Sequence, residues 1–437
     1  MFIKPLFFVI ALIALLFQKA YGQQTYSSLD SLLQHTAISS SVMRINQQQQ
    51  RLATLTHKAA IGNAFNPRIP LTASLIDNSK LPVNFIPAEV FGGPAGSFRQ
   101  ITLGQQYIST LAISPQIDLI NPGQMAKIKS ASLNEKLTDA QTGISKLTLF
   151  ENTNTCYYNI LSQQAQITVL EQHQILADSL VTLVKNRYAL GLARQQDVND
   201  AMANLISIKD KTGKLRISLQ QQYLILQTLM DTDTAILLSE NLMNFNPFAA
   251  ILQAQGTIKL QYQELKTAFS EQETKAAFMQ NYPVLSMVGN YNLQNNSNNH
   301  LLDNNNSWIK SYYWGLRLSW DLPTNVNKLT TMANNRIIAQ TENLQLEHVR
   351  RQNAAEQQQM NLDLQNYREQ YTNALQIMQL KQDNYYKSRL QYNENILGLD
   401  KLIISETDWL NSRINMIAAL AGIAHTQQKI NINNSIQ

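Results

Sequence analysis

Residues 308–323 alternate between two kinds of side chain. Small, polar and charged residues separate a series of apolar ones, which comprises Tyr312, Trp314, Leu316, Leu318, Trp320 and Leu322. Because successive strand side chains point to opposite faces, the pattern predicts a strand with one apolar face. About 9 to 11 tilted residues cross a bilayer, whereas soluble strands average five or six, so the length favours lipid on the apolar side. A half-buried strand of a soluble sheet remains the alternative for this stretch alone.

Three further segments predict strands by the same alternation. Ile69 to Leu75 forms the first, and a Gly/Pro-rich loop over residues 80–97 follows it. The second is expected to place Ile101, Leu103, Tyr107, Leu111 and Ile113 on one face, and the third Leu285, Met287, Tyr291 and Leu293. An Asn-rich loop over residues 294–307 leads to the strand described first.

Long helical segments alternate with these strands. Asn121 and Pro122 are suited to the cap and first position of a helix that no strong breaker stops before Gly191. At 1.5 Å per residue this helix extends about 100 Å and must pack lengthwise against others. After Gly191, apolar residues recur at a spacing of three and four from Val198 to Leu229, which predicts a coiled-coil hairpin with its tip at Gly191.

The order helix, two strands, long helix, tip and helix occurs twice. We therefore divide the chain into a signal peptide (residues 1–22), a first repeat (23–232), a connector (233–250) and a second repeat (251–437). The first repeat opens with helix from Ser27 to Ile61, and the second with helix from Ile251 to Gln280. Four strands cannot close a barrel, for which about eight are needed, whereas three copies supply twelve. The expected fold class is an α+β membrane protein, mainly long helical hairpins with four strands per chain.

The N-terminus carries Lys4, an apolar run to Phe17 and small residues near Gly22, as in a secretory signal peptide. No later apolar run is long enough for a membrane-spanning helix, so an integral protein would span with strands closed into a barrel. Cys156 is the only cysteine, which excludes a disulfide framework and is best explained as a small core residue.

Composition argues against several function classes. The net charge is +5, but basic residues are dispersed, which argues against nucleic acid as a partner. The six histidines show no metal-ligand spacing, and the glycines after Phe91 lack the Lys and Ser/Thr of a phosphate-binding loop. Asp231 and Asp233 are better explained as cap and turn residues than as metal ligands. We expect no enzyme, no cofactor and no metal.

The chain resembles the TolC-type outer-membrane factors of tripartite efflux pumps and type I secretion systems over its mature length. The first tip is the most specific part, with Tyr188, Gly191 three residues later, Asp197-Val198 and Ala201. The segment from Gly315 to Pro323 is similar to the family's last barrel strand. The resemblance implies a homotrimeric duct with a barrel in outer-membrane lipid and a periplasmic helical tunnel. A periplasmic adaptor (membrane fusion) protein docks on its tips and links it to an inner-membrane transporter.

The resemblance also implies site residues. The adaptor would dock on the tips, through Tyr188, Gly191, Arg194, Val198, Tyr392, Asn395 and Gly398. Aligning Tyr188 with Tyr392 places Asn395 opposite Gly191, and Asn tolerates a left-handed turn, although Gly398 is an alternative turn.

At the periplasmic entrance, the family's acidic positions six and nine past the turn hold Lys401 and Ile404 in the second repeat. Asp197 and Asp200 hold the matching positions in the first repeat, where they line the entrance or serve as helix-start residues. A secreted coiled-coil interaction or surface-attachment protein without a pore is the alternative function.

Overall fold

The computed structural model describes residues 24–250, 253–255, 257–322 and 324–436. The predicted signal peptide, Ile251 and Pro323 lie outside the described residues. The chain divides into two compact units, each made of segments far apart in sequence. The first comprises residues 1–50, 138–264 and 345–437, and the second comprises residues 51–137 and 265–344.

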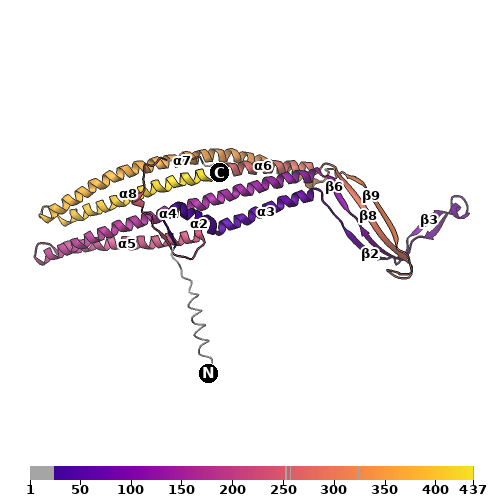
Figure 1. Cartoon of the computed structure of the whole chain (residues 1–437), viewed down its shortest axis with the longest axis horizontal. Helices are drawn as coiled ribbons and strands as arrows, with labels where there is room; N and C mark the ends of the chain where they lie inside the picture. The colour runs from indigo at the N-terminus through magenta and orange to yellow at the C-terminus, as the bar shows by residue number, and fades with distance from the viewer. Residues whose placement is uncertain (1–23, 251–252, 256, 323, 437) are drawn as a thin grey trace, which may run out of the picture. The chain divides into compact units, whose positions relative to one another are not determined.

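The second unit contains an antiparallel sheet whose strands lie side by side (Figure 1). Its strands are β2 (Leu71–Asp77), β5 (Tyr107–Ile113), β6 (Gln116–Ile120), β8 (Val284–Ser297) and β9 (Ile309–Ser319). β5 and β6 pair with successive parts of the same edge of β8, β9 pairs with the other edge, and β2 pairs with β5. β5 and β6 thus lie one after the other along β8 and together occupy one strand position. The sheet has four strand positions, with β2 and β9 at its edges.

The strand predicted from Ile101 to Ile113 is two separate elements, so its N-terminal bound was wrong. Residues 98–102 form β4 (Phe98–Thr102), which pairs with β3 (Val83–Pro87) in a hairpin of its own. Gly104, with a φ of 122°, lies between β4 and β5 in a conformation that interrupts a strand. The predicted loop over residues 80–97 therefore contains β3 and the short helix η1 (Ala88–Phe91). Alternation alone did not show this break, because both elements alternate.

Seven α-helices and three short elements complete the described part of the chain. They are β1 (Gln24–Tyr26), α2 (Leu29–Ser39), α3 (Ser41–Ala64), α4 (Pro122–Ala189), α5 (Gln195–Met230), β7 (Ile236–Leu238), η2 (Leu242–Asn244), α6 (Ile258–Met279), α7 (Val326–Asn393) and α8 (Leu399–Ser435). The predicted first helix is two helices, because Ser40 adopts an extended conformation. The helix predicted from Ile251 begins at Ile258. No helix in the described ranges combines the length and hydropathy needed to cross a membrane.

The core of the first unit lies between the hairpin of α4 and α5 and the hairpin of α7 and α8. The predicted spacing on α5 is confirmed at Val198, Ala201, Leu205 and Ile208, which are all buried. The equivalent positions on α8, including Leu402, Trp409 and Ile423, are buried too. Hydrophobic burial along these seams is the main contribution to helix packing.

Candidate functional site

The tip between α4 and α5 is a tight turn that depends on glycine. Gly191 has a φ of 72°, and its backbone N–H donates to the Tyr188 carbonyl at 2.9 Å. The N–H of Leu192 donates to the Arg187 carbonyl at 2.8 Å. These two bonds satisfy carbonyls at the helix end, as in a Schellman motif. Position 191 therefore requires a residue that can adopt the left-handed backbone conformation, which glycine does without strain.

The tip between α7 and α8 repeats this geometry with asparagine in place of glycine. Asn395 has a φ of 58°, and its N–H donates to the Tyr392 carbonyl at 3.1 Å. The N–H of Ile396 donates to the Gln391 carbonyl at 2.9 Å, as Leu192 does to Arg187. The alignment of Tyr188 with Tyr392 is thus confirmed. The alternative turn at Gly398 is wrong, because Gly398 is the extended N-cap of α8 with a φ of −70°.

An arginine that the sequence reasoning missed joins the two tips. The Arg187 guanidinium lies 4.6 Å from the Tyr392 ring centre. Its two terminal nitrogens donate to the carbonyls of Tyr392 and Asn393, at 3.2 and 3.0 Å. A cation at the C-terminal end of α7 also complements the helix dipole. Because Arg187 and Tyr392 are 205 residues apart, no local pattern could have paired them.

The predicted docking residues differ in exposure. Tyr188 is exposed, whereas Val198 and Tyr392 are buried and support the tips from inside. The most exposed apolar side chains at the turns are Leu190, Leu192 and Ile396, at 73%, 71% and 69%. Sequence reasoning overlooked these three, although each lies within one residue of its left-handed turn residue.

The predicted entrance residues differ in their hydrogen bonds and exposure. Asp197 accepts a hydrogen bond from the backbone N–H of Arg194, the residue that caps α5, at 2.8 Å. It thereby satisfies one donor at the helix start, which is the alternative role expected for it. Asp200 is exposed on the second turn of α5, and Lys401 is exposed on the first turn of α8. Asp200 therefore offers a solvent-facing charge that is independent of the cap.

One face of the sheet is apolar and exposed in the single chain. The register places Leu71, Ile113, Tyr291 and Tyr312 in one row across all four positions. The predicted lipid-facing side chains are highly exposed: Tyr312 80%, Trp314 80%, Leu316 65%, Leu318 69% and Trp320 63%. Trp320 lies just past β9, and its ring nitrogen donates to the Asn281 carbonyl at 2.9 Å. An exposed apolar surface of this extent indicates contact with a membrane or another protein surface.

The opposite face of the sheet is polar. Thr72, Ala112, Asn292 and Ser311 occupy the adjacent row of the register. In the middle of β6, the buried Asp118 carboxylate accepts from the Ser286 hydroxyl at 2.6 Å, and from the amides of Asn121 and Asn66. The two faces therefore have the chemistries of lipid and water.

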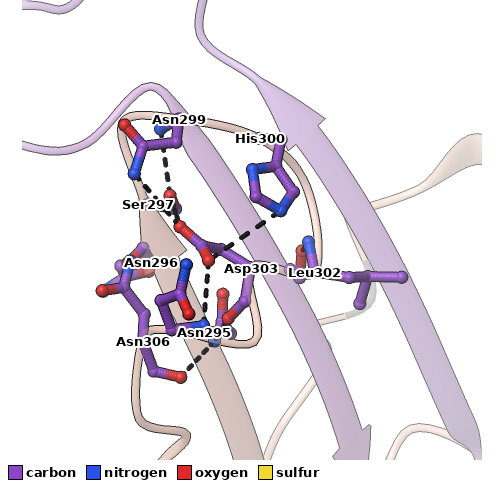
Figure 2. Close-up of polar contacts among 10 residues, drawn as sticks. Asn295, Asn296, Ser297, Asn299, His300, Leu302, Asp303 and Asn306 are labelled. Atoms are coloured by element: carbon purple, nitrogen blue, oxygen red, sulfur yellow. Dashed lines mark hydrogen bonds and ion pairs between the residues drawn. The ribbon is translucent and has the colours of Figure 1, made fainter.

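The Asn-rich loop after β8 is held by a buried carboxylate, as Figure 2 shows. Asp303 accepts from the Ser297 hydroxyl at 2.6 Å and from the Asn305 backbone N–H at 2.9 Å. The Asn295 amide donates to the carbonyls of Asp303 and Asn306. The hydrogen bond from Ser297 is the main cause that lowers the pKa of the Asp303 carboxyl. The loop predicted from residue 294 begins later, because β8 runs to Ser297.

Comparisons with known proteins point in one direction. The family model described as "Outer membrane efflux protein" matches residues 43–231. No curated protein matches the sequence significantly.

Several solved structures share the fold. The outer membrane protein VceC from Vibrio cholerae is 16% identical with a TM-score of 0.73, over 92% of this chain and 94% of that one. The Campylobacter jejuni CmeC outer membrane channel is 12% identical with a TM-score of 0.73, over 93% and 85%. The open-state MtrE outer membrane channel from Neisseria gonorrhoeae is 12% identical with a TM-score of 0.68, over 93% and 88%.

The predicted resemblance to outer-membrane factors is therefore confirmed, as is the fold class of long helical hairpins with four strand positions per chain. The family description and the names of the matched channels place those proteins in the outer membrane, in agreement with the localisation predicted from the sequence. CmeC and MtrE are both described as outer membrane channels.

Proposed function

We propose that this chain, which has the fold of outer membrane efflux channels, is one third of a passive exit duct. Three copies would close a barrel in the outer membrane, with the helices extending into the periplasm. The duct would receive substrates from an inner-membrane transporter through a periplasmic adaptor, in an efflux pump or a type I secretion system. Chemical energy would come from the transporter, so the duct needs no catalytic residue.

The observation that carries this proposal is a sheet with one apolar face and two unpaired edges. β2 and β9 each pair with one neighbour within the chain. Exposed strand edges are not tolerated in lipid, because their backbone groups would lack hydrogen-bond partners. Pairing β9 of one copy with β2 of the next satisfies both edges. Three copies of a sheet four positions wide then give a closed barrel of twelve.

The tips support the proposed docking of an adaptor. Leu190, Leu192 and Ile396 are exposed apolar residues on turns whose backbone is fixed by hydrogen bonds. Apolar side chains on a rigid turn suit a partner with a complementary apolar groove. The predicted residues Tyr188, Gly191, Arg194 and Asn395 belong to the same turns, and we include them in the proposed docking surface.

Cysteine cross-linking between copies tests the proposed assembly. We would place Cys at Thr72 or Ser74 of β2 together with Cys at Ser311 or Tyr313 of β9, in a background with Cys156→Ala. Oxidation of the detergent-extracted protein should give a covalent trimer, and each single-Cys variant should not. Conductance of the uncross-linked trimer in a planar bilayer then tests the pore.

A different outcome would favour the secreted coiled-coil protein. That protein would be released without detergent, would remain monomeric and would give no bilayer conductance. Finding all three properties would overturn the duct.

A further inference from the structure

A buried histidine and a buried carboxyl lie close together in the core of the first unit, and neither belongs to a tip turn. His173 of α4 and Glu406 of α8 are 0% and 2% exposed. The Nδ1 atom of His173 lies 3.9 Å from Oε1 of Glu406, too far for a direct hydrogen bond. Neither side chain has a role in the proposed duct so far.

All four helices of the two hairpins enclose the pair. Asn204 of α5 donates its amide to Oε2 of Glu406 at 3.1 Å. The His173 ring packs edge-on against the Trp409 ring, with 4.7 Å between the ring centres. The Tyr385 ring of α7 stacks on the same Trp409 ring, with 5.1 Å between the centres. The packing of α4 and α5 against α7 and α8 therefore passes through this cluster.

Several polar atoms of the cluster are buried without a hydrogen-bond partner. They are both ring nitrogens of His173, Oε1 of Glu406 and the ring nitrogen of Trp409. Buried polar groups are normally satisfied, so an unpaired acceptor beside an unpaired carboxyl oxygen needs an explanation. A proton on the carboxyl removes a buried charge that, among the described residues, no neighbouring cation or direct hydrogen bond to His173 compensates.

The charges around the pair come from a few side chains. Arg413 of α8 acts on His173 and donates to Gln172 of α4 at 2.7 Å. On α7, the Tyr385 hydroxyl interacts with Glu406, and Arg389 and Tyr386 interact with Tyr385. α5 contributes the neutral amide of Asn204.

Burial shifts the two groups in opposite directions. Burial raises the pKa of Glu406 to about 7, against an ordinary value of 4.5, and the hydrogen bond from Asn204 opposes this rise. Burial, with Arg413 as the second cause, lowers the pKa of His173 to about 4, against an ordinary value of 6.5. Both groups are therefore neutral in the packed helices under mildly acidic conditions.

We propose that His173 and Glu406 form a compensated proton site, in which one carboxyl proton is retained and the opposite responses of the two groups keep the helix packing nearly independent of pH. The site has a use if the proposed function holds, because a helical tunnel in the periplasm experiences the pH of the surrounding medium. Helix packing can be measured without a pore, so failure of this site and failure of the proposed duct are distinguishable.

Linkage determines the sign of each contribution. The contribution of Glu406 to packing is lost as pH rises from about 4.5 through about 7, because the packed state holds the proton more tightly. The contribution of His173 is lost as pH falls from about 6.5 through about 4, because the packed state resists protonation. Between about 4.5 and 6.5 the two slopes are opposite and offset each other.

Hydrogen exchange of the full-length, detergent-extracted protein tests this compensation. Protection factors, corrected for intrinsic exchange, would be measured for peptides covering residues 402–416 from about pH 4.5 to 7.5. The unaltered protein should vary by less than about threefold. In His173→Gln, protection should fall by about tenfold per pH unit as pH rises, because the pH dependence contributed by Glu406 is no longer offset by that of His173. In Glu406→Gln, it should fall at the same rate as pH decreases.

The double variant is the matched control and should again be insensitive to pH. A purely structural role would lower protection by the same factor at every pH, so parallel profiles for the single variants would overturn the proposal. If either variant does not assemble, infrared difference spectra of the unaltered chain give a second readout. A protonated carboxyl C=O band that is present at pH 6 and lost at pH 8 supports the site, and its absence overturns it.

Discussion

The Arg187 guanidinium lies over the Tyr392 ring and donates to the last carbonyls of α7, so that one side chain joins the two tips of a chain. A cation–π contact of this kind contributes about 0.5 to 1 kcal/mol at an exposed site. A hydrogen bond from a charged donor contributes roughly 1.5 to 3 kcal/mol. The contact therefore acts as a clamp between the hairpin of α4 and α5 and that of α7 and α8.

Replacing Arg187 with Gln should separate the tips without disturbing the sheet. We expect hydrogen exchange near residues 390–396 to become several-fold faster, since both the ring contact and the charged donors are lost. The trimer should still form, and its bilayer conductance should rise if the tips narrow the entrance. Lys185→Gln, which removes the same charge from an exposed position of α4, is the control. Equal behaviour of the two variants would rule out the clamp.

Gly191→Pro should disable the first tip. Proline fixes φ near −65°, whereas Gly191 needs 72°, and the substitution removes the N–H that donates to Tyr188. The strain should exceed about 1 kcal/mol and distort the turn that presents Leu190 and Leu192. We expect loss of adaptor binding in a pull-down, with normal membrane insertion.

Asn395→Gly is the matched control at the second tip. Its φ of 58° suits glycine, so this variant should bind the adaptor normally. Retention of adaptor binding by Gly191→Pro would contradict the docking assignment.

Substitutions of Asp197 and Asp200 near the start of α5 should have different effects on stability. Asp197→Ala removes the acceptor for the Arg194 N–H and should cost about 0.5 to 2 kcal/mol of local stability. Asp200→Ala removes an exposed charge and should leave stability unchanged. If both line the entrance, each variant should lower cation preference in bilayer reversal potentials. An unchanged preference in the double variant would exclude both from the entrance.

Trp314→Arg tests the lipid-facing assignment. Trp314 is 80% exposed on the apolar face, and an arginine facing the middle of a bilayer costs roughly 2 to 4 kcal/mol. We expect less heat-sensitive trimer in the outer-membrane fraction. Tyr313→Arg, on the polar face beside Asn290, should assemble like the unaltered protein. Equal yields of both variants would argue that the apolar face does not contact lipid.

Local patterns were sufficient for much of the site. The alternation from Tyr312 to Leu318 identified the apolar face, because strand periodicity depends only on neighbouring residues. Likewise, the offset from Tyr188 to Tyr392 located Asn395 as the second turn, since a left-handed position restricts residue type. The exposure of Leu190, Leu192 and Ile396 could not be predicted in this way, because apolar residues in a helical hairpin are buried or exposed according to how the turn is packed.

Other features lay beyond local reasoning. The break between β4 and β5 depends on which strand each segment pairs with, and both segments alternate. No local pattern pointed to Glu406, because its partner His173 lies on another helix and only the burial of both side chains shifts their pKa values.

The sequence by itself determined the alternation of long helices with strand segments, the two tip turns and the apolar strand face, because propensity, periodicity and backbone restriction act over a few residues. The tertiary structure alone decided that Arg187 clamps Tyr392, that β5 and β6 share one edge of β8, and that His173 is buried against Glu406. Those pairings join residues that are far apart in the sequence. Their energies depend on burial and on the distances between side chains, which are set only when the chain has folded.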